Sequence, residues 1–530
     1  MRCAMQLRGV EMRITSLGHA GFLVETDSAV VVADPWFSPS GAFDAAWFQF
    51  PRNHHLAALV QEKLADSRKT RYLYISHEHK DHFDKSFLDS IQCREFTVVI
   101  PHFHRAALAQ EMLDYQCKDV VLADHQEEIA IAGGSLTLYL DDSELNRDSA
   151  MLLKADGESF LNLNDCRISD ALPAIKREHG RIDVLAMQFS GANWHPVCYE
   201  YPAQRYQAIS RKKVMAKFHA VAQSIKAVSP DYYLASAGPP CFLDPMLMDI
   251  NFQDVNIFPQ AWEMTQYLDR RFPRSATAWP VLMPGDVLDV SANALQAGGS
   301  ERVDAGGFRD YITSYAAEYA GFFRARQEQY GTWDPVRLLH RLQEDLRGKL
   351  DALELRDRVT TNLYFGFTDV EDLALRVNFP DQDIALCRAV GEANFYQIRA
   401  PSWEVARVLE GRISWEDFAH TFRLRLSREP DVYQTIMSAF IRLEPDDLNR
   451  FCAKILNIES RQERILKEAN GSRYAVDRYC PHQGGDLKYG WIEDRRYLTC
   501  PRHGWRFDLE NEGACPDNLG TVHAVCLEED

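Results

Sequence analysis

Two short loops near the end of the chain constrain it most, because each places a cysteine beside a histidine. The first reads Cys480-Pro-His482, and the second, after 17 intervening residues, reads Cys500-Pro-Arg-His503. Each loop can supply one sulfur and one nitrogen ligand, so the pair can hold a metal group from opposite sides. Short apolar runs alternate here with glycine-rich turns, which predicts a small all-β module. Its expected strands are 454–458, 464–466, 473–476 and 497–499.

The residue types favour an iron–sulfur cluster over a zinc ion. A Rieske [2Fe–2S] cluster is bound by two thiolates on one iron and two imidazoles on the other. Gly484 and Gly485 would let the backbone approach the sulfides closely. The sequences of both loops resemble those of the Rieske domains of oxygenases and their ferredoxins. A Cys₂His₂ zinc site is the alternative. The expected cluster ligands are Cys480, His482, Cys500 and His503.

A second metal-binding pattern follows a predicted buried strand in the N-terminal half. The strand at 72–76 leads directly into the pattern H-x-H-x-D-H. One metal can take His77 and His79, and a second, about 3.5–4 Å away as in two-metal sites, can take Asp81 and His82. Three histidines and an aspartate this close together at a strand end are not typical of a structural role. The pattern therefore predicts a dinuclear metal site.

The histidine pattern resembles that of the metallo-β-lactamase superfamily, with Gly18-His19-Ala20-Gly21 and Ala33-Asp34-Pro35-Trp36 as supporting landmarks. Helical and strand patterns alternate along this part of the chain, which favours a layered α/β architecture. The resemblance implies an αββα sandwich over 12–300. We expect a mainly helical accessory region over 301–445 and the Rieske domain over 446–530.

The resemblance also implies further metal ligands. Most members of the superfamily carry a histidine where this chain reads Leu140-Asp141-Asp142-Ser143-Glu144. We assign Glu144 as the ligand, with Asp141 or Asp142 as alternatives, and Asp165 as the bridge between the metals. An acidic ligand makes the site harder, which favours iron over zinc. The last ligand is not obvious, and its weak candidates are Asp244, His195 and His219.

Together, the two modules resemble the CMP-N-acetylneuraminate hydroxylase family, which converts an N-acetyl group into N-glycolyl. In that family the Rieske module is N-terminal, whereas here it is C-terminal. The resemblance extends through the segments 34–36, 74–79, 164–166, 211–213, 237–238 and 425–433.

The predicted function is that of an iron-dependent monooxygenase. An external donor, such as a ferredoxin, a reductase or a cytochrome b5-like protein, would reduce the Rieske cluster. The cluster would pass electrons to the dinuclear iron site, which would use O₂ to hydroxylate a small N-acylated or nucleotide-sugar-like molecule. Asp81 and Glu144 are the candidate catalytic residues. The basic stretch Arg211-Lys212-Lys213 could bind a phosphate or carboxylate, although a solvated helix face is its more common role.

Two other functions remain open from the sequence. A lactonase-like zinc hydrolase would explain the histidine pattern but would give the Rieske domain no catalytic role. An electron-transfer or redox-sensing protein would explain the Rieske domain but would leave the histidine pattern unused. A mononuclear Rieske dioxygenase is disfavoured, because no separate His/His/carboxylate pattern stands outside the H-x-H-x-D-H segment.

Composition excludes several classes of partner. The 530 residues carry a net charge of −18, which repels nucleic acid and anionic membrane surfaces. No apolar run approaches the roughly 18 residues of a membrane span, and 1–12 lacks a hydrophobic stretch of signal-peptide length. The sequence therefore predicts a cytoplasmic protein. Most of the 12 cysteines are scattered singly, which does not suggest a disulfide framework.

Overall fold

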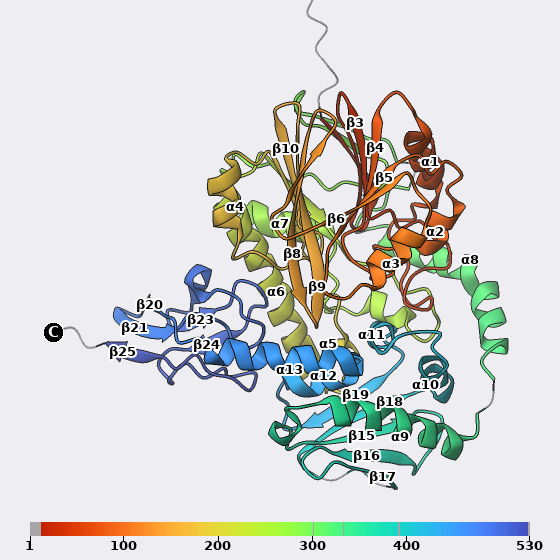
Figure 1. The fold of residues 1–530 in the computed structure, drawn as a ribbon, viewed down its shortest axis with the longest axis vertical. Coiled ribbons are helices and arrows are strands. Elements are labelled where there is room, and N and C mark those ends of the chain that lie inside the picture. The colour runs from red at the N-terminus through yellow and green to blue at the C-terminus, as the bar shows by residue number, and fades with distance from the viewer. Residues whose placement is uncertain (1–11, 300, 332, 389, 391–392, 528–530) are drawn as a thin grey trace, which may run out of the picture.

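The computed structural model describes residues 12–299, 301–331, 333–388, 390 and 393–527. Residues 1–11, which hold most of the N-terminal segment considered above, lie outside the described part, as do the last three positions of the expected Rieske domain. Figure 1 shows a large sandwich at one end, a mixed helical and sheet region at the other, and a small β module beside them. Among the described helices, none has the apolar length that crossing a bilayer demands.

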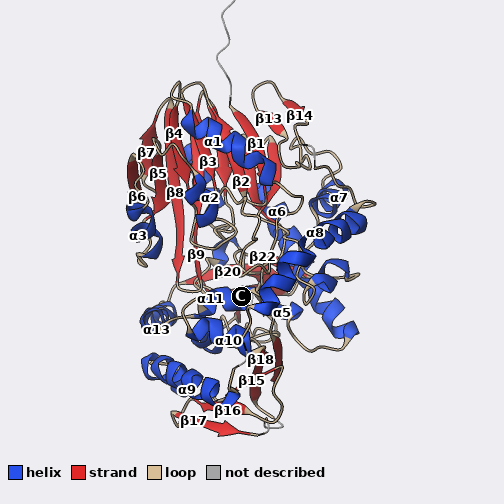
Figure 2. Ribbon diagram, turned by 90° about the vertical axis from the view of Figure 1, so that its right-hand side faces the viewer, coloured by secondary structure: helices blue, strands red, loops and turns tan. Residues whose placement is uncertain are grey.

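Two sheets stacked face to face form the N-terminal sandwich (Figures 1 and 2). The first runs in the order β14 (Ala294–Gln296), β13 (Val287–Asp289), β1 (Arg13–Gly18), β2 (Gly21–Glu25), β3 (Ala29–Ala33), β4 (Thr70–Tyr74), β5 (Thr97–Pro101) and β6 (Asp119–Ala123). The second runs in the order β12 (Tyr232–Ser236), β11 (Val184–Gln188), β10 (Glu158–Asn162), β9 (Asn146–Ala155), β8 (Gly134–Ser143) and β7 (Glu128–Ile131).

Helices cover both outer faces of the sandwich. The first sheet packs against α1 (Ala57–Ala65), α2 (Lys85–Ser90) and α3 (Ala107–Asp114). The second packs against α4 (Leu172–His179), α6 (Ala203–Val228) and α7 (Ala261–Arg271). Strand β3 shows why its sequence is continuously apolar: Val30 and Val32 pack under the helices, whereas Val31 and Ala33 face the second sheet. The αββα sandwich that the sequence predicts is confirmed.

The region between the sandwich and the β module contains the expected helices and also a sheet that was not predicted. Its helices are α8 (Phe308–Glu328), α9 (Pro335–Ala352), α10 (Ser402–Leu409), α11 (Trp415–His420) and α12 (Thr435–Arg442). The sheet runs in the order β17 (Asp383–Cys387), β16 (Ala374–Asn378), β15 (Asn362–Phe367), β18 (Phe395–Ala400) and β19 (Arg425–Glu429). Strand β19 pairs with β18, and its Leu426 also exchanges backbone hydrogen bonds with Cys198 and Glu200 of the sandwich domain.

The C-terminal module consists of two small sheets around the Cys/His loops. One comprises β20 (Arg464–Ala469), β21 (Ser472–Asp477) and β25 (Val525–Leu527), and the other comprises β22 (Trp491–Glu493), β23 (Tyr497–Thr499) and β24 (Arg506–Asp508). The strand expected at 454–458 is wrong, because these residues belong to α13 (Pro445–Ser460). Leu448, Phe451, Cys452 and Ile455 recur at helical spacing and are all buried.

Candidate metal centres

The histidine pattern occupies the loop between β4 and α2, at the edge where β3 also ends. Because β3 and β4 are parallel neighbours, Asp34 and Ser76 meet at this edge. The amide of Ser76 donates to Asp34 at 2.8 Å, and the other carboxylate oxygen of Asp34 lies 2.8 Å from Nδ1 of His82. Asp34 thereby fixes the His82 ring so that its Nε2 is free for another partner.

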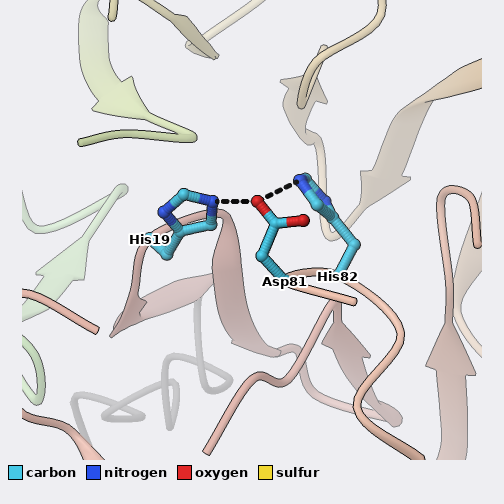
Figure 3. A group of neighbouring side chains, drawn as sticks. All are labelled: His19, Asp81 and His82. Atoms are coloured by element: carbon cyan, nitrogen blue, oxygen red, sulfur yellow. Dashed lines mark hydrogen bonds and ion pairs between the residues drawn. The ribbon is translucent and has the colours of Figure 1, made fainter. Parts of the chain in front are cut away.

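One ligand group joins the H-x-H-x-D-H loop to the turn between β1 and β2. Nε2 of His19 lies 2.9 Å from Oδ2 of Asp81, which in turn lies 3.9 Å from Nε2 of His82 (Figure 3). The candidate ligand atoms of these three residues all lie within 4.8 Å of one another. Sequence reasoning treated His19 only as a landmark; the signal that could have found it is a histidine inside the glycine-flanked turn Gly18–Gly21.

A second ligand group shares His82 and adds His77 and Asp165. Its candidate ligand atoms also lie within 4.8 Å of one another, with Nε2 of His82 3.9 Å from Oδ2 of Asp165. Nε2 of His77 lies 2.8 Å from Nδ1 of His79. Asp165 follows β10 and accepts a hydrogen bond from Gln188 on β11 at 2.5 Å. The structure thus brings the predicted His77, His79, Asp81, His82 and Asp165 together.

Glu144 is not brought to this cluster, which corrects the assignment made from the sequence. Strands β8 and β9 form a long hairpin, and Glu144 stands at its tip in a small pocket with His482 and Gln483 of the β module. The carboxylate of this hairpin that reaches the histidines is Asp148, whose Oδ1 lies 3.1 Å from Nδ1 of His77. The register of the hairpin, which the sequence did not specify, decides which acidic residue reaches the cluster.

The other sequence candidates also have partners away from the histidines. Asp141 lies 3.8 Å from Arg502, and Asp142 accepts from the amide of His104 at 2.9 Å. Asp244 accepts from the buried Arg423 at 2.8 Å. His195 lies 3.2 Å from the hydroxyl of Tyr201, and His219 lies 3.6 Å from Glu493.

The electrostatics of the histidine cluster fit the binding of cations. Burial by itself lowers the pKa of His82, but Asp81 and Asp34 more than offset burial and raise this pKa to about 10. Burial, followed by repulsion from Asp165, raises the pKa of Asp148 well above its usual range. Nε2 of His82 and Oδ1 of Asp81 are buried and have no hydrogen-bond partner among the described residues. Metal ions would neutralise the neighbouring carboxylates and supply the missing partners.

The central region covers this cluster. Glu416 on α11 lies 3.6 Å from Nε2 of His79. Burial lowers the pKa of His79, but Glu416 offsets it and raises that pKa to about 9. Glu416 also pairs with Arg147, which reaches Glu78 beside the histidines. A region without a chemical motif in the sequence therefore helps to orient a candidate ligand.

The two Cys/His loops meet as a cluster site requires. Cys480 and Cys500 are buried side by side, and the rings of His482 and His503 lie 4.6 Å apart between centroids. Nδ1 of His482 is buried without a hydrogen-bond partner among the described residues. A Cβ at Gly485 would lie 3.0 Å from Sγ of Cys500, which explains the glycine. These residues fit a Rieske cluster.

Strand β9 connects the two candidate centres within the chain. At its start, the side-chain amide of Asn146 donates to Gln483 at 2.5 Å and lies 3.1 Å from Nε2 of His503. Two residues along, Asp148 contacts His77. Residues two apart in a strand share a face, so a short covalent segment joins both sites. Arg502 lies 2.9 Å from Asp170 and fixes the second loop against the sandwich.

Comparison with protein families assigns both ends of the chain. Residues 444–524 match the Rieske [2Fe-2S] domain, and residues 13–206 match the β-lactamase superfamily domain. The chain therefore combines a β-lactamase-superfamily domain with a C-terminal Rieske [2Fe-2S] domain.

Individual relatives share one or both of these domains. A Rieske 2Fe-2S iron-sulfur protein of Mycolicibacterium smegmatis is 28% identical and aligns over 96% of this chain and 98% of its own. The cytidine monophosphate-N-acetylneuraminic acid hydroxylase of Asterias rubens is 21% identical over 82% of this chain and 65% of its own. Among solved structures, the diiron β-hydroxylase CmlA of Streptomyces venezuelae matches 53% of this chain and 54% of its own, with 17% identity and a TM-score of 0.36.

Proposed function

We propose that the protein is a Rieske-dependent monooxygenase that hydroxylates a small organic substrate with O₂ at a dinuclear iron site. The observation that carries the proposal is strand β9, whose Asn146 contacts a candidate Rieske ligand and whose Asp148 contacts a candidate ligand of the metal pair. A hydrolase would have no use for this connection, and a simple electron carrier would have no use for the buried histidine cluster. An oxygenase needs both.

The proposed ligands divide into three sets. Cys480, His482, Cys500 and His503 hold the Rieske cluster. His77, His79 and Asp148 would hold one metal, whereas His19, Asp81 and His82 would hold the other. Asp165 lies beside both His77 and His82 and would be placed to contact both metals. The carboxylates among the proposed ligands of the metal pair favour iron over zinc.

Iron bound in this pair would supply the O₂ chemistry, and the chain's residues would position it. Asp34 holds the ring of His82, and Glu416 holds that of His79. Gln188 orients Asp165 by donating to its carboxylate. The Asn146–Asp148 segment holds the Rieske loop at a fixed position relative to the pair. Such outer partners maintain ligand geometry and exclude water from the site.

The substrate class and the electron donor are further parts of this proposal. The similarity to the cytidine monophosphate-N-acetylneuraminic acid hydroxylase supports a small N-acylated or nucleotide-sugar-like substrate. An external ferredoxin, reductase or cytochrome b5-like protein would donate the electrons.

The test is a count of metals per chain on protein purified without oxygen, together with an EPR spectrum of the dithionite-reduced sample. The proposal predicts close to four irons, two of them accounted for by a Rieske signal. Two irons with one or two zinc ions that survive preparation in iron-rich medium would instead indicate a hydrolase with a redox module.

A further inference from the structure

A cavity of about 470 Å³ lies between α6, the central region and the Rieske loops. Its size suits a small organic molecule. His482, His503 and Asn146 line one side, and Trp194, Tyr433 and others supply aromatic walls. The basic side chains that line it are Arg167, Arg205, Lys212, Lys213, Arg428 and Arg442. So dense a basic lining is unexpected in a chain of net charge −18.

Most of these cations form ion pairs with neighbouring acids. Asp431 pairs with Arg205 and Arg428, and Asp517 pairs with Lys212. Arg442 pairs with Glu416. Of the six, only Arg167 and Lys213 are without an ion pair among the described residues.

Arg167 and Lys213 form no ion pair within 4.0 Å of a carboxylate among the residues that the structure describes, although Asp141 lies close enough to Arg167 to feel its charge. The ammonium of Lys213 donates only to the backbone carbonyl of His195, at 2.8 Å. Burial, and then repulsion from Arg167, lowers the pKa of Lys213 to about 7. Two unneutralised cations at one cavity wall destabilise each other unless an anion lies between them.

We propose that this cavity binds the phosphate or carboxylate group of an organic ligand through Arg167 and Lys213. A guanidinium donates two parallel hydrogen bonds to either anion, and a lysine adds a point charge. The aromatic walls would contact the remainder of the ligand. The inference rests on the proposed function only in taking the ligand to be the substrate. The basic residues of α6 therefore differ in their surroundings. Lys213 lines the cavity, whereas Arg211 is exposed and does not line it.

The first test is calorimetric titration of the metal-loaded protein with inorganic phosphate and, separately, with acetate, at constant ionic strength. Arg167→Gln and Lys213→Gln should each weaken binding about tenfold, the loss expected for one hydrogen bond to a charged group. Arg211→Gln on the same helix is the matched control and should leave binding unchanged. The probe that binds more tightly identifies the anion.

A second readout separates a binding role from a structural one. Because His503 lines the cavity, a bound anion should lower the midpoint potential of the Rieske cluster in the wild type but not in Arg167→Gln. If neither probe binds, or if Arg211→Gln weakens binding as much as the other two variants, the proposal is wrong. If the protein binds the anion but contains fewer than four irons per chain, the anion site is supported and the oxygenase function is contradicted.

Discussion

Asn146 and Asp148 lie two residues apart on one strand, and each contacts a different candidate metal centre. The amide of Asn146 lies 3.1 Å from Nε2 of His503, and the carboxylate of Asp148 lies 3.1 Å from Nδ1 of His77. This relationship places a Rieske loop and the histidine cluster at the two ends of one short segment of the same chain. It also makes the start of β9 the most informative place for substitutions.

Replacing Asn146 with alanine should slow oxidation of the reduced cluster by about tenfold, because outer partners of metal ligands typically contribute at least that much. The Rieske EPR signal should remain, since the four cluster ligands are untouched. Stopped-flow absorbance of the cluster after mixing with O₂ measures the rate. Asn457→Ala, on the exposed side of α13, is the control. Equal rates in both variants would contradict a role for Asn146.

Asp148→Ala and Glu144→Ala should differ in their effect on the iron content. The first removes the carboxylate beside His77 and should reduce the iron in the pair, whereas the second alters only the hairpin tip and should keep the full iron content. Metal analysis with the Rieske EPR signal as internal standard distinguishes them. Loss of iron from Glu144→Ala alone would restore the assignment made from the sequence.

His19→Ala should lower the affinity of the second metal, because His19 contributes to the group with Asp81 and His82. Metal content after dialysis against a chelator should fall by about one metal per chain, while the cluster spectrum stays unchanged. His55→Ala, a substitution of an exposed histidine, is the control. Retention of the full metal content in His19→Ala would mean that His19 only supports Asp81.

Sequence reasoning located the Cys/His loops, the histidine pattern and the buried strand before it, because each depends on local spacing. It failed where distant segments decide. His19 joins the site only because the β1–β2 turn folds against the histidine loop. The register of the hairpin places Asp148, and not Glu144, beside His77, and β19 is a strand because it pairs with β18 earlier in the chain. The segment 454–458 has strand-like composition, but its burial follows a helix.

Lys349 offers a test of the packing of the central region through pH. Burial lowers its pKa from 10.5 to about 8, so the unfolded chain binds more protons than the folded chain between these values. The free energy of unfolding contributed by Lys349 should therefore rise as the pH increases from 8 to 10.5. Lys349→Met should lack this rise in denaturant titrations and should be more stable at pH 7. Lys226→Met, at an exposed lysine, should behave like the wild type.

The most direct test of the central claim is single-turnover oxidation of the cluster. Protein reduced with dithionite and freed of the reductant is mixed with O₂, and the Rieske absorbance is followed at several protein concentrations. The account predicts that oxidation is independent of protein concentration and is strongly slowed in His77→Ala, whose cluster spectrum stays intact. Equal rates in the wild type and His77→Ala would show that electrons leave the cluster without passing to the metal pair, and would contradict it.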